Sequence, residues 1–371
     1  MSIYCNILKT SGPVKVYLEE RMKISHNVPL ANYTSLKAGG NAETLIEIED
    51  SDNLKQTLSD PSLGRPVWIL GYGTNCLISD HGLPGSVILN RKGSLSQLSP
   101  TRFKVTSGYD WDEFIRALII DGLWGLEFTS GIPGGVGAAI VGDIAAYGHK
   151  VADSLVEATI FDLDNEQIET WGKDKFDFSY RTSSLKLPEN KNKVVLDATF
   201  ELSATPTGEL EYDSALKAAT ELGLKPDSLV NRRKIIMEAR RQAGSLFLDP
   251  KVGPWTAGSF FKNPLVSEAL ADAIMKYEEH QISGTQIAHQ NLIHGENKSR
   301  VSAAHVLLAA GFHRGQTWGQ VRLHPDHILK IENVGAATAQ EIYDVVQHIV
   351  ETVRQKLGIT LEPEVRFLGQ F

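Results

Sequence analysis

Cysteine is nearly absent from this sequence, because Cys5 and Cys76 are the only two in 371 residues. Two cysteines supply neither the several disulfides of a small secreted domain nor a metal cluster of cysteine ligands. Uninterrupted apolar runs of roughly 18 residues are also missing, so the sequence offers no candidate membrane span. The segment 1–24 lacks an apolar core of signal-peptide length. We therefore expect a cytoplasmic protein.

Positive charge is scarce as well. Lysine and arginine number 37 against 45 acidic residues, which gives a net charge of −8 at pH 7. Proteins that bind nucleic acids usually carry a basic domain or stripe. The densest basic group surrounds Glu238 and is interpreted as a solvated helix face, with contact to an anionic ligand as the alternative. Its members are Arg232, Arg233, Lys234, Arg240 and Arg241. We expect no nucleic-acid partner and no membrane partner.

The sequence does contain many short strand-like and helical segments. Strand-like runs cover Glu43–Ile48, Val67–Leu70, Ser86–Leu89, Phe103–Val105, Leu155–Phe161, Val194–Leu202, Ile328–Glu332 and Ile359–Leu361. Helical spacing covers Asp110–Asp121, Leu265–Tyr277, Ser302–Ala310 and Ala337–Lys356, with a charged helical stretch over 209–243 and a further short helix compatible with Val14–Met22. Strands and helices do not alternate strictly, which predicts an α+β fold of two or three domains.

A first glycine turn follows the strand-like run that ends at Leu70. Gly71 and Gly73 flank a tyrosine, and Thr74 and Asn75 come next. The dinucleotide fingerprint of Rossmann domains is not complete, because Cys76 replaces its third glycine and no helix follows. Two interpretations stay open: a simple tight hairpin, or a turn that directs several backbone N–H groups at a pyrophosphate.

A second glycine-rich segment spans residues 125–148. Its glycines stand at positions 131, 134, 135, 137, 142 and 148, with apolar residues between them. So many glycines cost backbone entropy, which favours close approach of the chain to a flat or charged ligand over a merely flexible loop. Neither segment is a P-loop motif. The two together predict a site for a dinucleotide with a large planar ring.

Five motifs resemble those of one enzyme family. They are GYGTN, SGIPGGVGAAIVGDIAAYG, FDFSYRTS, TAGSFFKNP and LEPEVRF. They occur in the family's order between residues 26 and 371, and the sequence is identified as similar to the UDP-N-acetylenolpyruvoylglucosamine reductases. The long segment between Thr205 and Leu248 resembles the longer subtype, which carries a substrate-covering loop at this place.

The resemblance implies an α+β fold with a two-part FAD-binding region like that of vanillyl-alcohol oxidase and a smaller α+β substrate-binding domain. The boundaries that follow are an N-terminal extension over 1–24, FAD-binding subdomains over 25–92 and 93–206, and a substrate-binding domain over 207–371. This last domain contains the covering loop and a C-terminal catalytic strand. The sequence leaves the oligomeric state open, and a monomer is favoured.

The resemblance also implies FAD as the cofactor, NADPH as the hydride donor and an enolpyruvyl UDP-sugar as the substrate. NADPH would reduce the flavin and leave before the sugar nucleotide enters, and the product would be the peptidoglycan precursor UDP-N-acetylmuramate. The implied FAD contacts are Gly71, Tyr72, Gly73, Thr74, Asn75, Ile132, Pro133, Gly137, Ala138, Val141, Ile144 and Tyr147.

The chemistry of such a reaction requires particular side chains. Hydride addition to the β-carbon of an enolpyruvyl ether develops charge next to the carboxylate, so a cation and a proton donor are needed there. The resemblance assigns Arg181 to the carboxylate, Ser259 to protonation of the α-carbon, and Glu364 to a place beside them. Without it, Arg181 is a surface ion-pair partner and Ser259 a turn residue. Period-two spacing places Glu362 and Glu364 on one strand face and does not distinguish them.

Several positions depart from the family pattern. Asp143 and Ala145 replace an asparagine and a glycine, His305 replaces a tryptophan, and Ala243 stands where a lysine is usual. A carboxylate at position 143 would slightly disfavour an anionic reduced flavin. The implied substrate contacts are Tyr180, Tyr212, Lys262, Asn263 and His327. Of these, Tyr212, Asn263 and His327 are expected at the phosphate end, with Lys262 or Arg241 supplying the charge; a core aromatic is the alternative for Tyr212.

Two other functions compete with the reductase. A flavin oxidase of the vanillyl-alcohol type would keep the fold and react rapidly with oxygen, without needing the arginine, serine and glutamate. A non-catalytic FAD-binding protein would be yellow yet inert to NADPH. A serine hydrolase is disfavoured, because the residues around Ser259 do not form a nucleophile elbow.

Overall fold

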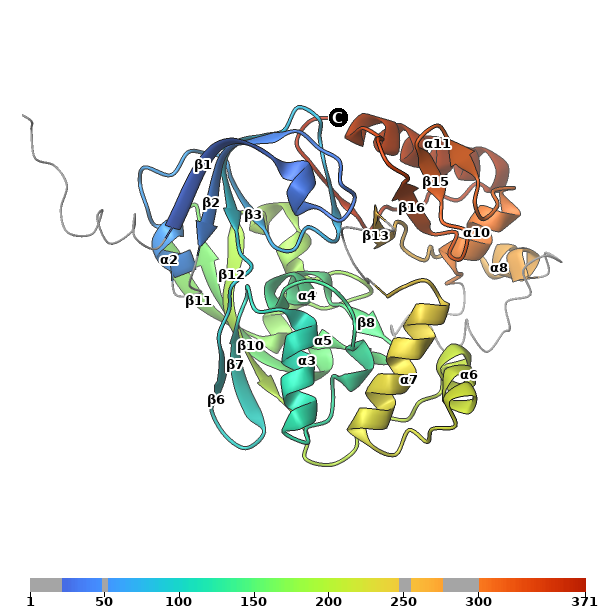
Figure 1. Cartoon of the computed structure of the whole chain (residues 1–371), viewed down its shortest axis with the longest axis horizontal. Coiled ribbons are helices and arrows are strands. Elements are labelled where there is room, and N and C mark those ends of the chain that lie inside the picture. Colours follow the sequence, from blue (N-terminus) through green and yellow to red (C-terminus); the bar gives the residue numbers. More distant parts are fainter. Residues whose placement is uncertain (1–21, 49–52, 247–254, 276–299) are drawn as a thin grey trace, which may run out of the picture.

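The computed structural model describes residues 22–48, 53–246, 255–275 and 300–371. The helix considered for residues 14–22 lies outside these ranges except for Met22, which begins the first strand. Within them, no helix is long and apolar enough to cross a membrane. The chain forms three sheets of four or five strands, shown from blue to red in Figure 1.

The N-terminal sheet has the order β1 (Met22–Pro29), β2 (Asn41–Ile48), β5 (Leu83–Leu89), β3 (Val67–Leu70). Strands β2 and β3 run parallel to β5 on either side of it. Because layers cover both faces of β5, every residue of this strand except Pro84 is buried. Val87 and Leu89 enter one core, whereas Ile88 enters a second core with residues of the next sheet. A short 3₁₀ helix, η1 (Leu30–Tyr33), and α2 (Asn53–Leu58) complete this unit.

The second sheet is antiparallel, with the order β11 (Gln167–Gly172), β10 (Leu155–Asp162), β12 (Lys193–Glu201), β7 (Arg102–Thr106), β6 (Leu95–Gln97). Helices α3 (Trp111–Ile120) and α4 (Val136–Gly142) share its hydrophobic core. Asp110 caps α3 by accepting the Glu113 N–H at 2.9 Å. Short elements around this unit are η2 (Glu127–Thr129), β8 (Ala145–Ala146), β9 (His149–Lys150), α5 (Val151–Ser154), η3 (Lys173–Phe176), η4 (Ser184–Lys186) and η5 (Pro188–Asn190).

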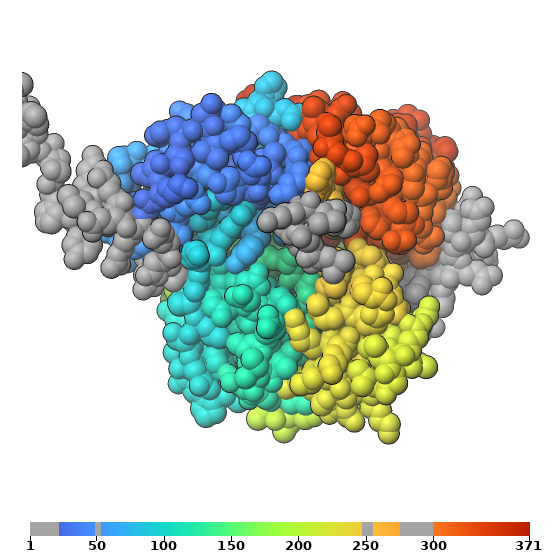
Figure 2. All heavy atoms as spheres, in the orientation of Figure 1, coloured from blue at the N-terminus to red at the C-terminus, as the bar shows by residue number. Residues whose placement is uncertain are grey.

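The third sheet has the order β13 (Trp255–Ser259), β16 (Lys330–Asn333), β15 (Val321–Leu323), β14 (Thr317–Trp318). Helices α8 (Glu268–Met275), α10 (Ala303–Ala309) and α11 (Ala339–Leu357) accompany it. Thr338 and Glu341 form a reciprocal capping box at the start of α11, whose buried face completes the core of this unit. In Figure 2 this unit (orange to red) adjoins the N-terminal sheet (blue).

The charged stretch 209–243 forms two helices rather than one, α6 (Asp213–Leu222) and α7 (Leu229–Gln242). Gly223 ends α6 in the left-handed conformation, and the Ser228 side chain caps α7. The interpretation of its basic residues as a solvated face is wrong for Arg232, which is 6% exposed and donates to Glu127 at 2.8 Å. Arg233 likewise pairs with Asp112 of α3.

The chain ends in β17 (Arg366–Leu368), which pairs in parallel with β4 (Cys76–Ile78). The prediction of a strand over Ile359–Leu361 is wrong. This segment is irregular, and it buries Ile359 and Leu361 in the core under α11. The hairpin interpretation of the first glycine turn is also wrong. Strand β3 pairs with β5 and β4 pairs with β17, so the turn carries the chain from one sheet to another.

Candidate active site

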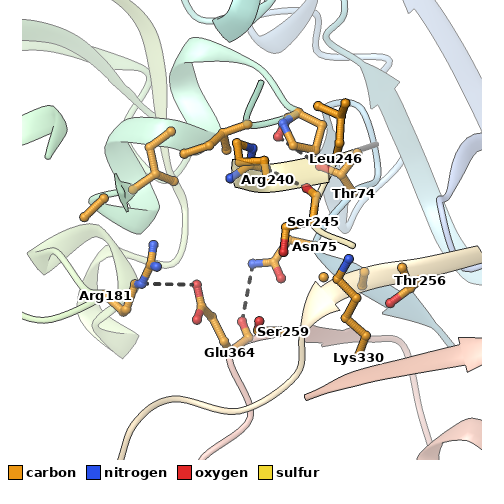
Figure 3. A pocket seen from close by; sticks show the side chains of 16 residues that line it. Thr74, Asn75, Arg181, Arg240, Ser245, Leu246, Thr256, Ser259, Lys330 and Glu364 are labelled. Carbon is orange, nitrogen blue, oxygen red and sulfur yellow. Dashed lines mark hydrogen bonds and ion pairs between the residues drawn. The ribbon is translucent and has the colours of Figure 1, made fainter. Parts of the chain in front are cut away.

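A cavity of about 240 Å³ lies where the three sheets meet, and Figure 3 shows it. The loops after β3 and before α4 form part of its wall, and the strands β13 and β16 form another part. Its lining consists of Thr74, Asn75, Ile132, Pro133, Ile144, Ala145, Arg181, Arg240, Ser245, Leu246, Thr256, Ala257, Gly258, Ser259, Lys330 and Glu364. All three residues expected to be catalytic are therefore brought to one cavity from distant parts of the sequence.

Arg181 is held in a tight turn, where Ser179 and Thr182 exchange two backbone hydrogen bonds. Its backbone has a φ of +57°, which is uncommon for a residue other than glycine. The Lys186 ammonium donates to the Arg181 carbonyl oxygen at 2.7 Å and so anchors the turn. Nε of Arg181 lies 3.8 Å from a carboxylate oxygen of Glu364, which raises the pKa of the arginine against the effect of burial. The guanidinium stays charged beside the cavity.

Ser259 ends β13 next to an irregularity in the sheet. Gly258 has a φ of +79°, a backbone conformation that disfavours side chains with a Cβ, and the β13–β16 register shifts between Thr256 and Ser259. After the shift Ser259 pairs directly with Lys330. Cross-strand partners project to the same face of a sheet, so the serine hydroxyl and the lysine side chain both belong to the cavity wall.

The two glutamates near the C-terminus have different surroundings. Glu362 is 69% exposed and forms an ion pair with Lys262. Glu364 is 21% exposed, lines the cavity and faces Arg181. The expectation that both lie on one face of a strand is wrong, because β17 starts only at Arg366 and the preceding segment makes an isolated bridge at Pro363. The structure thus separates two residues that their spacing left equivalent.

The expected FAD contacts divide into two groups. Thr74, Asn75, Ile132, Pro133 and Ile144 line the cavity. The lining does not include Gly71, Tyr72, Gly73, Gly137, Ala138, Val141 and Tyr147.

Some of these seven positions have evident roles within the protein. A Cβ at position 73 would lie 2.1 Å from the Tyr33 carbonyl oxygen, and one at position 137 would lie 2.8 Å from the Ser107 side chain. The glycines there allow close packing of the chain on itself. Tyr147 packs edge-to-face on Tyr212 with ring centroids 5.6 Å apart.

The cavity suits an anionic, partly polar ligand such as FAD. Its lining contains three cations, Arg181, Arg240 and Lys330, and one carboxylate, that of Glu364. Three buried polar atoms of the lining, Nε of both arginines and the Thr256 hydroxyl, have no hydrogen-bond partner among the described residues. Buried polar groups are normally satisfied, so these atoms indicate places where a ligand supplies the missing partner.

Sequence reasoning missed Arg240, Ser245, Thr256 and Lys330. The interpretation as a solvated helix face is wrong for Arg240, which lines the cavity and whose pKa is lowered by burial, and the alternative of contact with an anionic ligand stays a prediction. Thr256 and Lys330 belong to strands β13 and β16, and the sheet face on which each side chain lies depends on the register of these strands. The available signals were that Thr256 begins the matched motif TAGSFFKNP and that Lys330 interrupts an otherwise apolar strand-like run.

The expected substrate contacts lie around the cavity rather than in its lining. The Tyr180 hydroxyl accepts the Asn263 N–H at 3.2 Å, and the Asn263 side chain accepts the Ala303 N–H at the start of α10. Burial lowers the pKa of His327 to about 4, so this imidazole is neutral at neutral pH. Arg241, one candidate for the phosphate charge, instead pairs with Glu238 on the surface.

Two family models match the chain. Residues 249–368 match the C-terminal domain of UDP-N-acetylenolpyruvoylglucosamine reductase. Residues 43–170 match an FAD binding domain, which includes Thr74, Asn75 and the second glycine-rich segment. The expectation of FAD as cofactor is therefore confirmed.

Whole relatives match across nearly the full length. The UDP-N-acetylenolpyruvoylglucosamine reductase of Thermobifida fusca (strain YX) is 32% identical over 358 residues, covering 93% of this chain and 98% of that protein. The enzyme of the same name from Corynebacterium glutamicum (strain R) is 29% identical and covers 98% of this chain and 99% of its own length. The crystal structure of the reductase from Thermus caldophilus aligns with a TM-score of 0.57 at 22% identity, over 94% of this chain and 99% of that one. The expected α+β fold with an FAD-binding region is confirmed.

Proposed function

Because this chain belongs to the UDP-N-acetylenolpyruvoylglucosamine reductase family, we propose that Arg181, Ser259 and Glu364 carry out its substrate half-reaction. The activity is the reduction of the enolpyruvyl group of UDP-N-acetylenolpyruvoylglucosamine to give UDP-N-acetylmuramate, with FAD as the cofactor and NADPH as the hydride donor. The product supplies peptidoglycan synthesis, through which the enzyme serves cell shape and division. The reaction takes place in the cytoplasm.

One observation carries this assignment. Arg181, Ser259 and Glu364 come from three separate regions of the chain, and they line one cavity together with Thr74 and Asn75 of the FAD binding domain. The backbone hydrogen bond from Arg366 to Asn75 and the β4–β17 pairing hold the C-terminal segment beside the first glycine turn. This arrangement is what a substrate half-reaction next to a cofactor requires.

FAD, held in this cavity beside Thr74 and Asn75 and reduced by NADPH, would supply a hydride to the β-carbon of the enolpyruvyl group. The Arg181 guanidinium binds the substrate carboxylate and stabilises the negative charge that develops beside it. The Ser259 hydroxyl donates a proton to the α-carbon. Glu364 lies next to Arg181 and contacts the developing enolate.

The phosphate end of the substrate extends away from these residues toward Tyr212, Asn263 and His327. Tyr212 is half-buried beside Tyr147 in the small core of α6 and α7, which the longer subtype uses to cover the substrate. We assign the positive charge at this end to the Lys262 ammonium, which pairs with the exposed Glu362.

The Ser259→Ala variant tests the assignment by separating the two half-reactions. It should bind FAD and be reduced by NADPH at the wild-type rate, because the serine acts only on the enolpyruvyl substrate. Reoxidation by that substrate should slow by roughly 10²-fold or more, the usual scale for loss of a positioned acid. Rapid-mixing absorbance of the flavin measures both steps, and Ser245→Ala, which removes another cavity hydroxyl, is the matched control. Reoxidation of Ser259→Ala at the wild-type rate would show that the proton comes from elsewhere.

A further inference from the structure

Lys330 is a buried cation that the proposed mechanism does not use. It lies at the start of β16 and lines the cavity, yet it is only 5% exposed. Its ammonium makes no hydrogen bond and no ion pair with any residue that the structure describes. In Figure 3 the side chain rises from the strand and its nitrogen points into the cavity.

Among the described residues, the charged groups around Lys330 do not neutralise it. Arg240 of α7 is another cation and opposes its charge. Asp326, in the turn before β16, is largely exposed, and Glu332 on the same strand is paired with Arg322 at 2.7 Å. Burial together with Arg240 lowers the pKa of Lys330 to about 8, and the two acidic residues only partly offset this effect.

A buried ammonium without a counter-ion is costly, whereas an apolar side chain would fill the same space on a sheet at no such cost. The cavity ligand is therefore the natural source of the missing negative charge. The carboxylate of the substrate is already assigned to Arg181, beside Glu364. Lys330 must therefore face a second anionic group of the ligand. That group lies near Ser259, because Ser259 and Lys330 are cross-strand partners.

We propose that Lys330 is the cation that compensates the negative charge gained by the flavin ring when bound FAD is reduced, so that it raises the reduction potential of the cofactor. Positive charge near the ring nitrogens is a known means by which proteins tune flavins. This inference rests on the proposed function in taking FAD as the ligand of this cavity and in assigning the substrate carboxylate to Arg181, and it does not depend on the role of Ser259.

The test is the two-electron midpoint potential of the FAD-loaded protein, measured by spectroelectrochemistry without substrate. Lys330→Met should lower the midpoint potential by at least about 30 mV, which corresponds to a tenfold change in the equilibrium constant for reduction. Lys330→Arg, which keeps the charge, should restore most of the difference. Lys193→Met is the matched control, because Lys193 is also largely buried but pairs with Asp162 and does not line the cavity. Lys330→Gln repeats the removal of charge with a polar side chain.

The pH dependence gives a second readout. Negative charge on the flavin raises the pKa of Lys330, so reduction above pH 8 takes up one additional proton per two electrons in the wild type. Above pH 8 the slope of the midpoint potential against pH should therefore be steeper by about 30 mV per pH unit in the wild type. Lys330→Met and Lys330→Gln should lose this additional slope.

An unchanged potential in Lys330→Met and Lys330→Gln would overturn the proposal. If those variants instead weakened binding of the enolpyruvyl substrate to the oxidised enzyme by tenfold or more, at an unchanged potential, the charge would belong to the substrate. Failure of the proposed function is a distinct outcome. It would appear as wild-type protein that is reduced by NADPH but not reoxidised by the substrate, and the potentials would still be measurable.

Discussion

Replacing Asp143 by asparagine should stabilise the protein in a manner that depends on pH. Asp143 ends α4 in the left-handed conformation, with a φ of +43°, and it is 4% exposed. Its carboxylate accepts the Ala152 N–H at 3.2 Å. Burial raises the pKa of this carboxyl to about 6, although that hydrogen bond and Lys150 lower it. Asparagine can accept the same hydrogen bond and is among the residues that best tolerate left-handed backbone.

The magnitude follows from the two pKa values. The pKa of this carboxyl rises from its ordinary value of 3.8 to about 6 in the folded protein, which makes the ionised form about 3 kcal/mol less favourable there. Because the folded state binds more protons between these two pH values, the free energy of unfolding falls as the pH rises through this window. The increase in the free energy of unfolding caused by Asp143→Asn should therefore be absent below about pH 4, roughly half complete at pH 5 and complete above about pH 7.

Urea unfolding of both proteins at pH 5 and pH 8, with the same saturating FAD concentration, measures this difference. Asp143→Ala is the control, since it also removes the charge but loses the hydrogen bond and disfavours the left-handed backbone. A gain of equal size at both pH values, or a loss at pH 8, would refute the reasoning from burial. The side chain does not line the cavity, so reduction by NADPH should change little.

Three further predictions concern the active site. Glu364→Gln should retain much more activity than Glu364→Ala, while Glu362→Gln should leave kcat unchanged because that side chain points to solvent; equal losses at both positions would contradict the separation described above. Lys186→Met should slow substrate-dependent reoxidation about tenfold by releasing the Arg181 turn, and Lys186→Arg should recover most of it; a general loss of stability without this rescue would argue for a merely structural role. Tyr212→Phe should raise KM for the sugar nucleotide more than about threefold with kcat little changed, and an unchanged KM would remove it from the phosphate end.

Much of the secondary structure could be predicted because its signals are local. The apolar spacing and the Asp110 cap mark α3 within one residue at each end, and the strand-like run Val67–Leu70 coincides with β3. Gly223, which ends α6, marks the interruption of the charged stretch in the sequence as well. The strand prediction for Ile359–Leu361 is wrong because buried apolar residues in an irregular segment have the same composition as a short strand.

The sequence by itself determined the enzyme family, the cofactor and the three residues of the proposed half-reaction, because motif order and residue type are properties of the chain alone. Only the tertiary structure decided which residues share the cavity. The β4–β17 pairing brings Glu364 beside the first glycine turn and leaves Glu362 in solvent. The register of β13 on β16 places Lys330 opposite Ser259. Contacts between segments so far apart depend on strand register and on the packing of whole sheets, and local spacing carries no information about either.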